Sequence, residues 1–241
     1  MTKKRLDIEM SERGLVSSRS QAESFIKLGK VKVDGRVVAK PGHFVHGDVD
    51  IQLKAEEQYV SRAGLKLASV AQLLGLDFDN KIILDVGSST GGFTDYALKH
   101  GAKKVYAVDV GTEQLHPQLR GNPRIELHEK TDIRDFKLDK DTPQIIVIDV
   151  SFISLRDILP HIARHLSNKG TQIVAMVKPQ FEAGRNQTNK GIIKNDAVRR
   201  QILRDFEAWA KHSFTIADKR DSDVAGAKGN QERFYVLQTL V

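Results

Sequence analysis

The stretch IILDVGSSTGGF, residues 82–93, decides the fold. Its first five residues form an apolar run typical of a buried strand in a parallel sheet, and the glycines after it predict a turn into a helix. Glycine lets a ligand approach the backbone, and the first turn of a helix offers unpaired N–H groups. A Gly-rich turn alone is weak evidence of function, and the spacing Gly87-x-x-x-Gly91-Gly92 fits neither G-x-G-x-x-G nor a P-loop.

Strand candidates alternate with helical patterns along the rest of the chain. We expect strands at 82–86, 105–108, 145–148, 173–177 and 234–240, and helices near 65–74, 93–99, 157–165 and 197–209. This alternation is typical of a doubly wound α/β sheet, which binds ligands at the carboxyl ends of its strands. Asp109 ends the second run, where a carboxylate accepts hydrogen bonds from a ribose diol. The sequence therefore predicts a ribose-containing cofactor.

Composition excludes several classes of protein. The 241 residues are 40% apolar and 29% charged, as is usual for a globular domain. With no cysteine, a thiolate nucleophile, a disulfide framework and an iron–sulfur cluster are all excluded. The longest apolar stretches, 145–150 and 173–177, are too short for a transmembrane helix, and the first ten residues lack the apolar core of a secretory signal. We expect a cytoplasmic protein with no membrane partner and no metal site.

The first 54 residues predict a compact α+β unit. Ser20 and Glu23 have the spacing of a capping box, which predicts a short helix. The Asp34-Gly35 pair between two valine-rich runs is the strongest short hairpin signal, and the alternation over 49–53 predicts one more strand.

A domain boundary is predicted in the polar segment that follows. Residues 54–59 show neither strand nor helix periodicity, so we place the boundary near residue 58 and expect domains 1–58 and 59–241. The chain carries 38 Lys and Arg against 31 Asp and Glu, and residues 1–40 alone hold ten against five. A basic unit of this kind favours a polyanionic partner.

Residues 5–42, RLDIEMSERGLVSSRSQAESFIKLGKVKVDGRVVAKPG, resemble the RNA-binding domain of the ribosomal protein S4 family. The helix and hairpin of this unit would present a basic face to RNA phosphates. The predicted contacts are Arg5, Arg13, Arg19, Lys27, Lys30, Lys32 and Arg36. The alternative is a solvated basic surface without a partner. Since no aromatic platform is evident, we expect recognition through RNA shape and phosphates.

The second domain resembles S-adenosylmethionine-dependent methyltransferases, and more closely the FtsJ-like ribose 2′-O-methyltransferases. Four positions carry the closer resemblance: Lys66 in SRAGLKL, Asp149 after the third strand, Lys178 in MVKP and Glu232 in GNQERF. The whole arrangement, with an S4-like domain in front, resembles the TlyA family, which is described as ribosomal RNA cytidine 2′-O-methyltransferases and also carries a haemolysin label. The resemblance implies S-adenosylmethionine as cofactor and ribosomal RNA or ribosomal subunits as partner. The implied cofactor residues are Asp85, Gly87, Ser88, Gly91, Gly92, Phe93, Asp109 and Asp132.

Methyl transfer to a ribose hydroxyl needs a positioned base, because the hydroxyl is a poor acid. An amine serves as that base only when burial or a neighbouring cation favours its neutral form. We predict Lys178 as the base with Lys66 beside it, Asp149 holding Lys178 or the sulfonium side of the cofactor, and Glu232 orienting Lys66 or the ribose. Taken singly, each of these side chains is more often a solvated surface charge or a cap.

Three other functions remain open from the sequence. A different methyl acceptor is the nearest, although Asp149-Val150-Ser151-Phe152 lacks the prolines of amino-group methyltransferases. A membrane-active haemolysin and a noncatalytic ribosome-assembly module are the others. The loop 184–191 is either a lid or RNA contact, or an ordinary connection. The sequence identifies neither the nucleotide, the ribosomal subunit, the oligomeric state nor the orientation of the basic domain.

Overall fold

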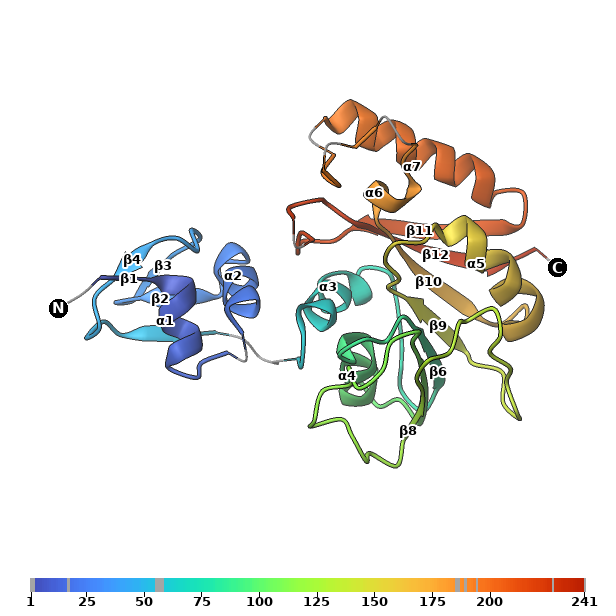
Figure 1. The fold of residues 1–241 in the computed structure, drawn as a ribbon, viewed down its shortest axis with the longest axis horizontal. Helices are drawn as coiled ribbons and strands as arrows, with labels where there is room; N and C mark the ends of the chain where they lie inside the picture. Colours follow the sequence, from blue (N-terminus) through green and yellow to red (C-terminus); the bar gives the residue numbers. More distant parts are fainter. Residues whose placement is uncertain are drawn as a thin grey trace.

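The computed structural model describes residues 3–16, 18–54, 59–184, 187–188, 190–193, 195–226 and 228–240. A small N-terminal unit stands beside a larger α/β domain, and the two follow each other along the chain (Figure 1). Within the described residues, no helix combines the length and the apolar character needed to cross a membrane.

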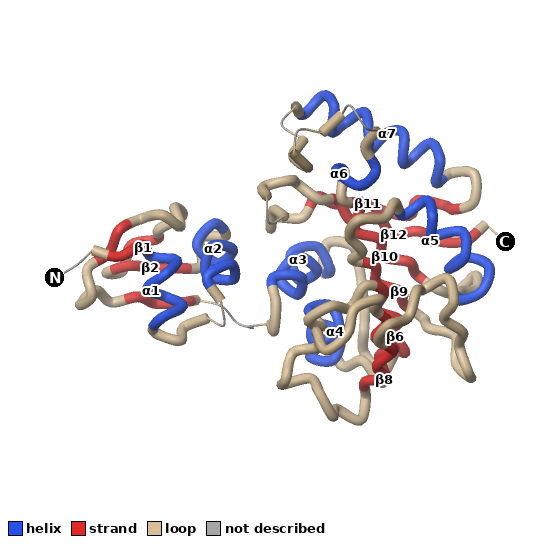
Figure 2. The backbone as a smooth tube through the Cα atoms, in the orientation of Figure 1, coloured by secondary structure: helices blue, strands red, loops and turns tan. Residues whose placement is uncertain are grey.

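A seven-stranded sheet forms the centre of the larger domain (Figure 2). Its order is β11-β12-β10-β9-β6-β7-β8, and β12 runs antiparallel to both of its neighbours while the other pairs are parallel. The strands are β6 (Ile82–Val86), β7 (Lys104–Val108), β8 (Ile125–His128), β9 (Ile145–Ile148), β10 (Gln172–Val177), β11 (Phe214–Asp221) and β12 (Arg233–Thr239). The predicted doubly wound α/β sheet is confirmed.

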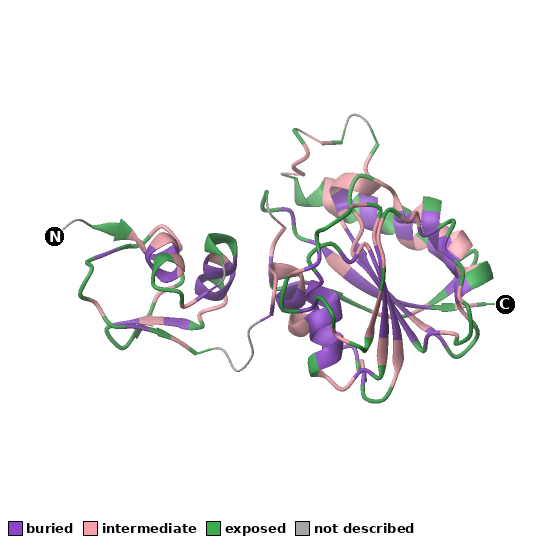
Figure 3. Cartoon of the chain, turned by 60° about the horizontal axis from the view of Figure 1, so that its bottom comes forward, coloured by how far each residue is buried: buried purple, intermediate pink, exposed green. Residues whose placement is uncertain are grey.

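Helices cover both faces of this sheet. One face carries α3 (Arg62–Ala71) and α4 (Gly92–Lys99), and the other carries α5 (Leu155–His161), its π-helical continuation η1 (Ile162–Leu166) and α7 (Asp196–Ala210); a short α6 (Pro179–Glu182) follows β10. Successive residues of β9 enter opposite cores, because strand side chains alternate between the two faces. The central strands are therefore buried throughout, as Figure 3 shows.

The N-terminal unit confirms the predicted hairpin. Its elements are β1 (Lys4–Arg5), α1 (Leu6–Glu12), α2 (Arg19–Lys27), β2 (Val31–Val33), β3 (Arg36–Val37), β4 (Phe44–Val45) and β5 (Ile51–Leu53). Asp34 and Gly35 both have positive φ, 47° and 78°, as a tight turn between β2 and β3 requires. The predicted capping box is wrong. Ser18, not Ser20, caps α2 by accepting a 3.2 Å hydrogen bond from the Gln21 N–H, and Ser20 lies inside the helix.

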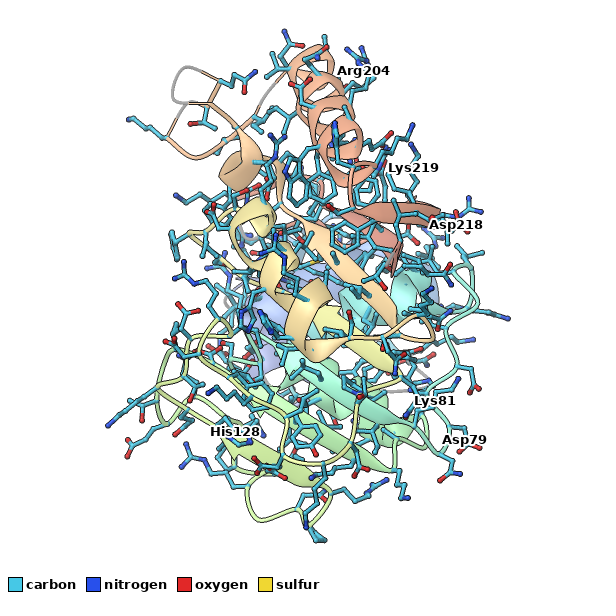
Figure 4. The ribbon with its side chains drawn as sticks, turned by 90° about the vertical axis from the view of Figure 1, so that its right-hand side faces the viewer. Asp79, Lys81, His128, Arg204, Asp218 and Lys219 are labelled. Carbon is cyan, nitrogen blue, oxygen red and sulfur yellow. The ribbon has the colours of Figure 1, made fainter. Side chains whose placement is uncertain are left out.

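Several elements were not predicted. Neither α1 nor the edge strands β8 and β11 follow from the hydrophobic pattern, because these segments are partly polar and only one side of each strand is paired. His128 lies on the outer strand β8 (Figure 4). The helix expected at 157–165 begins at Leu155 and becomes π-helical from Ile162.

Buried and partly buried contacts hold the junction between the two units. The predicted boundary at residue 58 lies outside the described residues, and Tyr59 is the first residue after it. The Gln21 side chain of α2 donates a 2.6 Å hydrogen bond to the Tyr59 carbonyl, and the Val60 N–H donates to the Asp95 carboxylate of α4 at 2.9 Å. The Tyr59 ring lies 5.4 Å from that of Tyr96.

Candidate active site

Three adjoining cavities lie at the carboxyl ends of the parallel strands, where ligands of such sheets bind. Their volumes are about 800, 360 and 140 Å³, and all three share Asp149 and Ser151 in their linings. We name them the acceptor, adenosyl and methionine cavities respectively, after the parts of the substrate and cofactor that the family resemblance leads us to expect there. Asp149 follows β9, so the central strand delivers one carboxylate to every part of the site.

The glycine turn after β6 brings the backbone segments of the site close together. Gly87 has φ +77°, and a Cβ there would lie 2.8 Å from the Asp149 carbonyl oxygen, so no larger residue fits. Gly91 and Gly92 also lack room, but their neighbours are Leu115 and Leu119 for the one and the start of α3 for the other. Neither residue lines the three cavities, so their assignment to the cofactor stays a prediction.

The methionine cavity contains a buried carboxylate that pairs with no cation of the described residues. Asp85 is fully buried; one carboxylate oxygen accepts a 2.6 Å hydrogen bond from the Thr94 hydroxyl, and the other has no hydrogen-bond partner in the described part of the chain. Burial raises the pKa of Asp85 to about 7, the Asp149 and Asp109 charges add to the increase, and the Thr94 hydrogen bond opposes it. Ser88 and Phe93 line the same cavity. Because the described residues leave one Asp85 oxygen without a partner there, the cavity suits a small cationic group.

The adenosyl cavity combines apolar walls with two carboxylates besides that of Asp149. Val108, Ile133 and other apolar side chains line it together with Asp109 and Asp132. The Asp109 carboxylate accepts hydrogen bonds from the N–H groups of Ser89 and Gly111, at 2.8 and 2.7 Å, which fixes its orientation.

Asp132 is held ionised at the same cavity. It is paired with Arg134 at 2.6 and 2.9 Å, and the hydrogen bonds from this guanidinium, outweighing burial, lower the pKa of Asp132 to about 2. An ionised carboxylate is a hydrogen-bond acceptor only, so Asp132 is suited to an amino group such as that of an adenine.

The structure brings the four predicted catalytic side chains together as two ion pairs. Lys178, after β10, lies 2.6 Å from an Asp149 carboxylate oxygen and donates a 2.7 Å hydrogen bond to Ser151. Lys66, on α3, pairs with Glu232, just before β12, and both side chains are almost fully buried. All four line the acceptor cavity.

Two aromatic residues of the site were missed by the sequence reasoning. Phe152 is 91% exposed, has φ +67°, and lines both the acceptor and the adenosyl cavities. Its ring lies 5.2 Å from that of Phe181, which also lines the acceptor cavity. The sequence shows a phenylalanine three residues after Asp149, but it does not show that this side chain is exposed.

Three of the arginines predicted to bind RNA form ion pairs within the N-terminal unit. Arg5 and Arg19 both bind the fully buried Asp7, at 2.9 and 2.8 Å. Arg13 pairs with Glu9 at 2.8 Å and also donates to two backbone carbonyls. Their guanidinium groups remain partly exposed, with side-chain exposures of 28 to 52%. Lys27, Lys30 and Arg36 are not buried, and Lys32 is half-buried.

The N-terminal unit contributes to the acceptor cavity. Ser18 and Ser20, at the start of α2, line it together with Arg62, Lys190 and Lys228. Lys190 belongs to the loop 184–191, of which residues 185, 186 and 189 lie outside the described part of the chain. Asn230 joins this loop to the segment before Glu232, because its side chain donates to the Gly191 carbonyl and accepts from the Ile193 N–H.

Comparison with known proteins identifies both domains. Residues 59–239 match the family model of FtsJ-like methyltransferases, and residues 4–51 match the S4 domain. Hemolysin A of Brachyspira hyodysenteriae is 42% identical over 95% of this chain and 97% of its own. The protein of Mycobacterium tuberculosis named 16S/23S rRNA (cytidine-2′-O)-methyltransferase TlyA is 34% identical over 98% of this chain and 90% of its own.

The fold has a close counterpart among solved structures. A hemolysin-named protein of Streptococcus thermophilus superimposes with a TM-score of 0.73 at 38% identity, covering 99% of this chain and 89% of its own. The order of the two domains and the relatives at 34 to 42% identity agree with the family resemblance found in the sequence. The chain belongs to the FtsJ-like methyltransferases and, within them, to the TlyA family, in which an S4 domain precedes the methyltransferase domain.

Proposed function

We propose that this protein transfers a methyl group from S-adenosylmethionine to a ribose 2′-hydroxyl of ribosomal RNA, with cytidine as the acceptor nucleoside. The observation that carries the proposal is the pair of lysine–carboxylate contacts, Lys178–Asp149 and Lys66–Glu232, around a cavity that adjoins two cofactor-sized cavities. The choice of RNA and of cytidine rests on the S4 domain and on the name of the Mycobacterium tuberculosis relative.

The residues of the two smaller cavities fit S-adenosylmethionine. The unpaired oxygen of Asp85 suits the cofactor's ammonium group, Asp109 suits its ribose hydroxyls, and Asp132 suits its adenine amino group. The bound cofactor supplies an electrophilic methyl group. The shared residues Asp149 and Ser151 border both the cofactor cavities and the acceptor cavity, which supports a reaction across that border.

The chain's own residues would then position the hydroxyl and take up its proton. Lys178 is held by Asp149 and Ser151, so its amino group has a fixed place at the border of the cavities. Entry of cofactor and RNA displaces water, and loss of water favours the neutral form of an amine. Lys178 must first lose its own proton to solvent. Its neutral amine then accepts the hydroxyl proton as the new O–C bond forms and the bond between sulfur and methyl breaks, while the buried Lys66–Glu232 pair fixes another part of the cavity wall.

The rim of the acceptor cavity suits an RNA backbone. Arg62, Lys190 and Lys228 lie on it, and the two serines at the start of α2 bring the RNA-binding unit to the same opening. Positive side chains contact phosphates and fix the register of a nucleic acid without reading its bases. The N-terminal unit and the rim are therefore proposed as one continuous RNA surface.

Methylation of separated ribosomal subunits tests the proposal. We would incubate purified protein with labelled S-adenosylmethionine and each subunit, and map the product by resistance to alkaline hydrolysis, because a 2′-O-methyl group blocks cleavage at its own linkage. Lys178→Ala should lower the single-turnover rate by about a hundredfold or more. Lys169→Ala, in the exposed loop before the opposite end of β10, is the matched control and should leave the rate unchanged.

Two results would contradict the proposal. Label that enters a base or a protein would show that the acceptor is not a ribose hydroxyl. Near-normal transfer by Lys178→Ala, with cofactor binding intact by calorimetry, would remove this lysine as the base.

A further inference from the structure

Glu182 lies outside the three cavities, yet it connects their walls. It ends α6, a few residues after Lys178, and its side chain is 2% exposed. One carboxylate oxygen accepts a 2.7 Å hydrogen bond from the Leu155 N–H, and the other accepts one of 2.7 Å from the Ser154 hydroxyl. Ser154 and Leu155 form the beginning of α5. A residue on the β10 side of the site thus holds the end of the loop that follows β9.

This contact is the last of a series that joins two neighbouring segments. Residues 149–155 leave β9 and residues 178–182 leave β10. The Lys178–Asp149 ion pair joins them near the sheet, the Phe152–Phe181 ring contact joins them further out, and Glu182 closes the far end. The two segments are therefore fixed to each other along their whole length.

The middle of the first segment is strained and needs support at both ends. Phe152 has φ +67° and is 91% exposed, although a bulky residue in this conformation costs about 1–3 kcal/mol. Such a conformation persists only where the surrounding structure holds it. The β9 ladder holds the segment before Asp149, and Glu182 holds it after Ile153.

The surroundings of Glu182 require an acceptor with two free oxygens. Ser154 already accepts a hydrogen bond from the Arg156 N–H, so its hydroxyl proton is available to Glu182. Burial raises the pKa of Glu182, the two hydrogen bonds and Arg156 at 3.6 Å oppose that increase, and Asp157 adds to it. A glutamine amide has one acceptor oxygen and one donor group, so it could keep both contacts only if Ser154 turned its proton away and accepted a second hydrogen bond beside that from the Arg156 N–H; the negative charge opposite Arg156 would still be lost.

We propose that Glu182 is a positioning residue, whose carboxylate fixes the segment after β9 against the segment after β10 and so holds Lys178, Asp149 and Phe152 in the geometry for methyl transfer. The inference rests on the proposed function, since its catalytic readout is the same reaction. It assigns to Glu182 no contact with cofactor or RNA.

The test compares Glu182→Gln with a matched control, Glu207→Gln. Glu207 is also a part-buried carboxylate of this domain with two close partners, Lys219 at 2.7 Å and Tyr235 at 2.8 Å, but it lies on α7. At saturating cofactor and RNA, Glu182→Gln should lower the single-turnover rate at least tenfold. Glu207→Gln should leave the rate within twofold, even where both variants lose thermal stability. Ser154→Ala, which removes one of the two hydrogen bonds, should give an intermediate rate and serves if Glu182→Gln does not fold.

Amide hydrogen exchange supplies a readout without activity. Because the Leu155 N–H is bonded to Glu182, the variant should lose protection over residues 150–155, whereas Glu207→Gln should not. Equal rates for Glu182→Gln and the wild type, or unchanged exchange over 150–155, would overturn the inference. Absence of transfer by the wild type would instead overturn the proposed function, and the exchange result would still decide the role of Glu182.

Discussion

The acceptor cavity and the methionine cavity each contain a buried carboxylate, and within the part of the chain that the structure describes only the one in the acceptor cavity is paired with a cation. Glu232 of the acceptor cavity has Lys66 as its cation, and both side chains are almost fully buried. Asp85 of the methionine cavity accepts from the Thr94 hydroxyl, and one of its oxygens is unpartnered among the described residues. The charge of Glu232 is thus neutralised by the chain itself, whereas Asp85 has no ion-pair partner among the described residues, although Lys178 lines the same cavity, and is suited to a cation from outside. The difference predicts a structural role for the Lys66–Glu232 pair and a ligand-binding role for Asp85.

The largest expected effect comes from removing the internal cation. Lys66→Ala leaves Glu232 buried and uncompensated, so the free energy of unfolding should fall by about 3–5 kcal/mol. Lys81→Ala breaks the exposed Lys81–Asp77 pair, whose lysine is labelled in Figure 4, and should cost about 1 kcal/mol or less. Urea unfolding of both variants measures the contrast. Similar losses of unfolding free energy in the two variants would show that the buried pair has no special structural role.

The opposite sign is expected when the carboxylate without a cation is neutralised. The pKa of Asp85 is about 7 in the folded chain against 3.8 in the unfolded chain, so the unfolded chain ionises first and stability falls as pH rises from about 4 to 7. Asp85→Asn should therefore raise the free energy of unfolding at pH 8 by about 2–4 kcal/mol. At pH 4 the variant and the wild type should unfold alike. A less stable variant at pH 8 would refute the assignment.

A third carboxylate extends the comparison to the N-terminal unit. Asp7 is fully buried like Asp85, and burial alone would raise its pKa, but the hydrogen bonds from Arg5 and Arg19 lower that pKa to about 2. Its contribution is present above about pH 4 and is lost as pH falls through 2. Asp7→Asn should cost about 2 kcal/mol at pH 7. If the free energy of unfolding of the wild type and of Asp7→Asn is measured at several pH values, the difference between the two proteins should narrow from pH 4 to pH 2.

The smallest effect concerns the cofactor itself. If the ammonium group of S-adenosylmethionine pairs with ionised Asp85, its binding must first remove a proton from that carboxyl at acidic pH. The affinity should then rise about tenfold between pH 5.5 and pH 7. Calorimetric titration at several pH values measures this, and Asp85→Asn should bind weakly with no such slope. A flat wild-type profile would place the ammonium elsewhere.

The sequence predicted the parts of the site that follow from strand order. The family resemblance singled out Asp149 and Lys178, and the strand pattern added that each follows a buried run and so lies at the carboxyl edge of the sheet; the structure shows the two side chains in contact. The pairing of Lys66 with Glu232 was one of two alternatives that the family resemblance suggested, and spacing could not decide between them, because distance along the chain carries no information about contact. The role of Gly91 and Gly92 in packing was likewise invisible, since it depends on neighbours from other elements.

Each of the errors has its own physical cause. Two serines compete to cap α2, and only the backbone conformation of Ser18, which is extended, decides between them. The edge strands β8 and β11 contain polar residues at exposed and half-buried positions, so their hydrophobic pattern is weak. Phe152 was hidden for a different reason: its exposure depends on a left-handed backbone that composition does not reveal.

The shared border at Asp149 and Ser151 has a consequence for inhibitor design. Three cavities meet there, and Gly87 brings the glycine turn after β6 against the backbone of Asp149 without an intervening side chain. A single molecule can therefore join a cofactor-like part to a nucleoside-like part through a short linker that crosses this border. Because the two parts bind without separate losses of translational freedom, such a compound should exceed the affinity of either fragment by orders of magnitude.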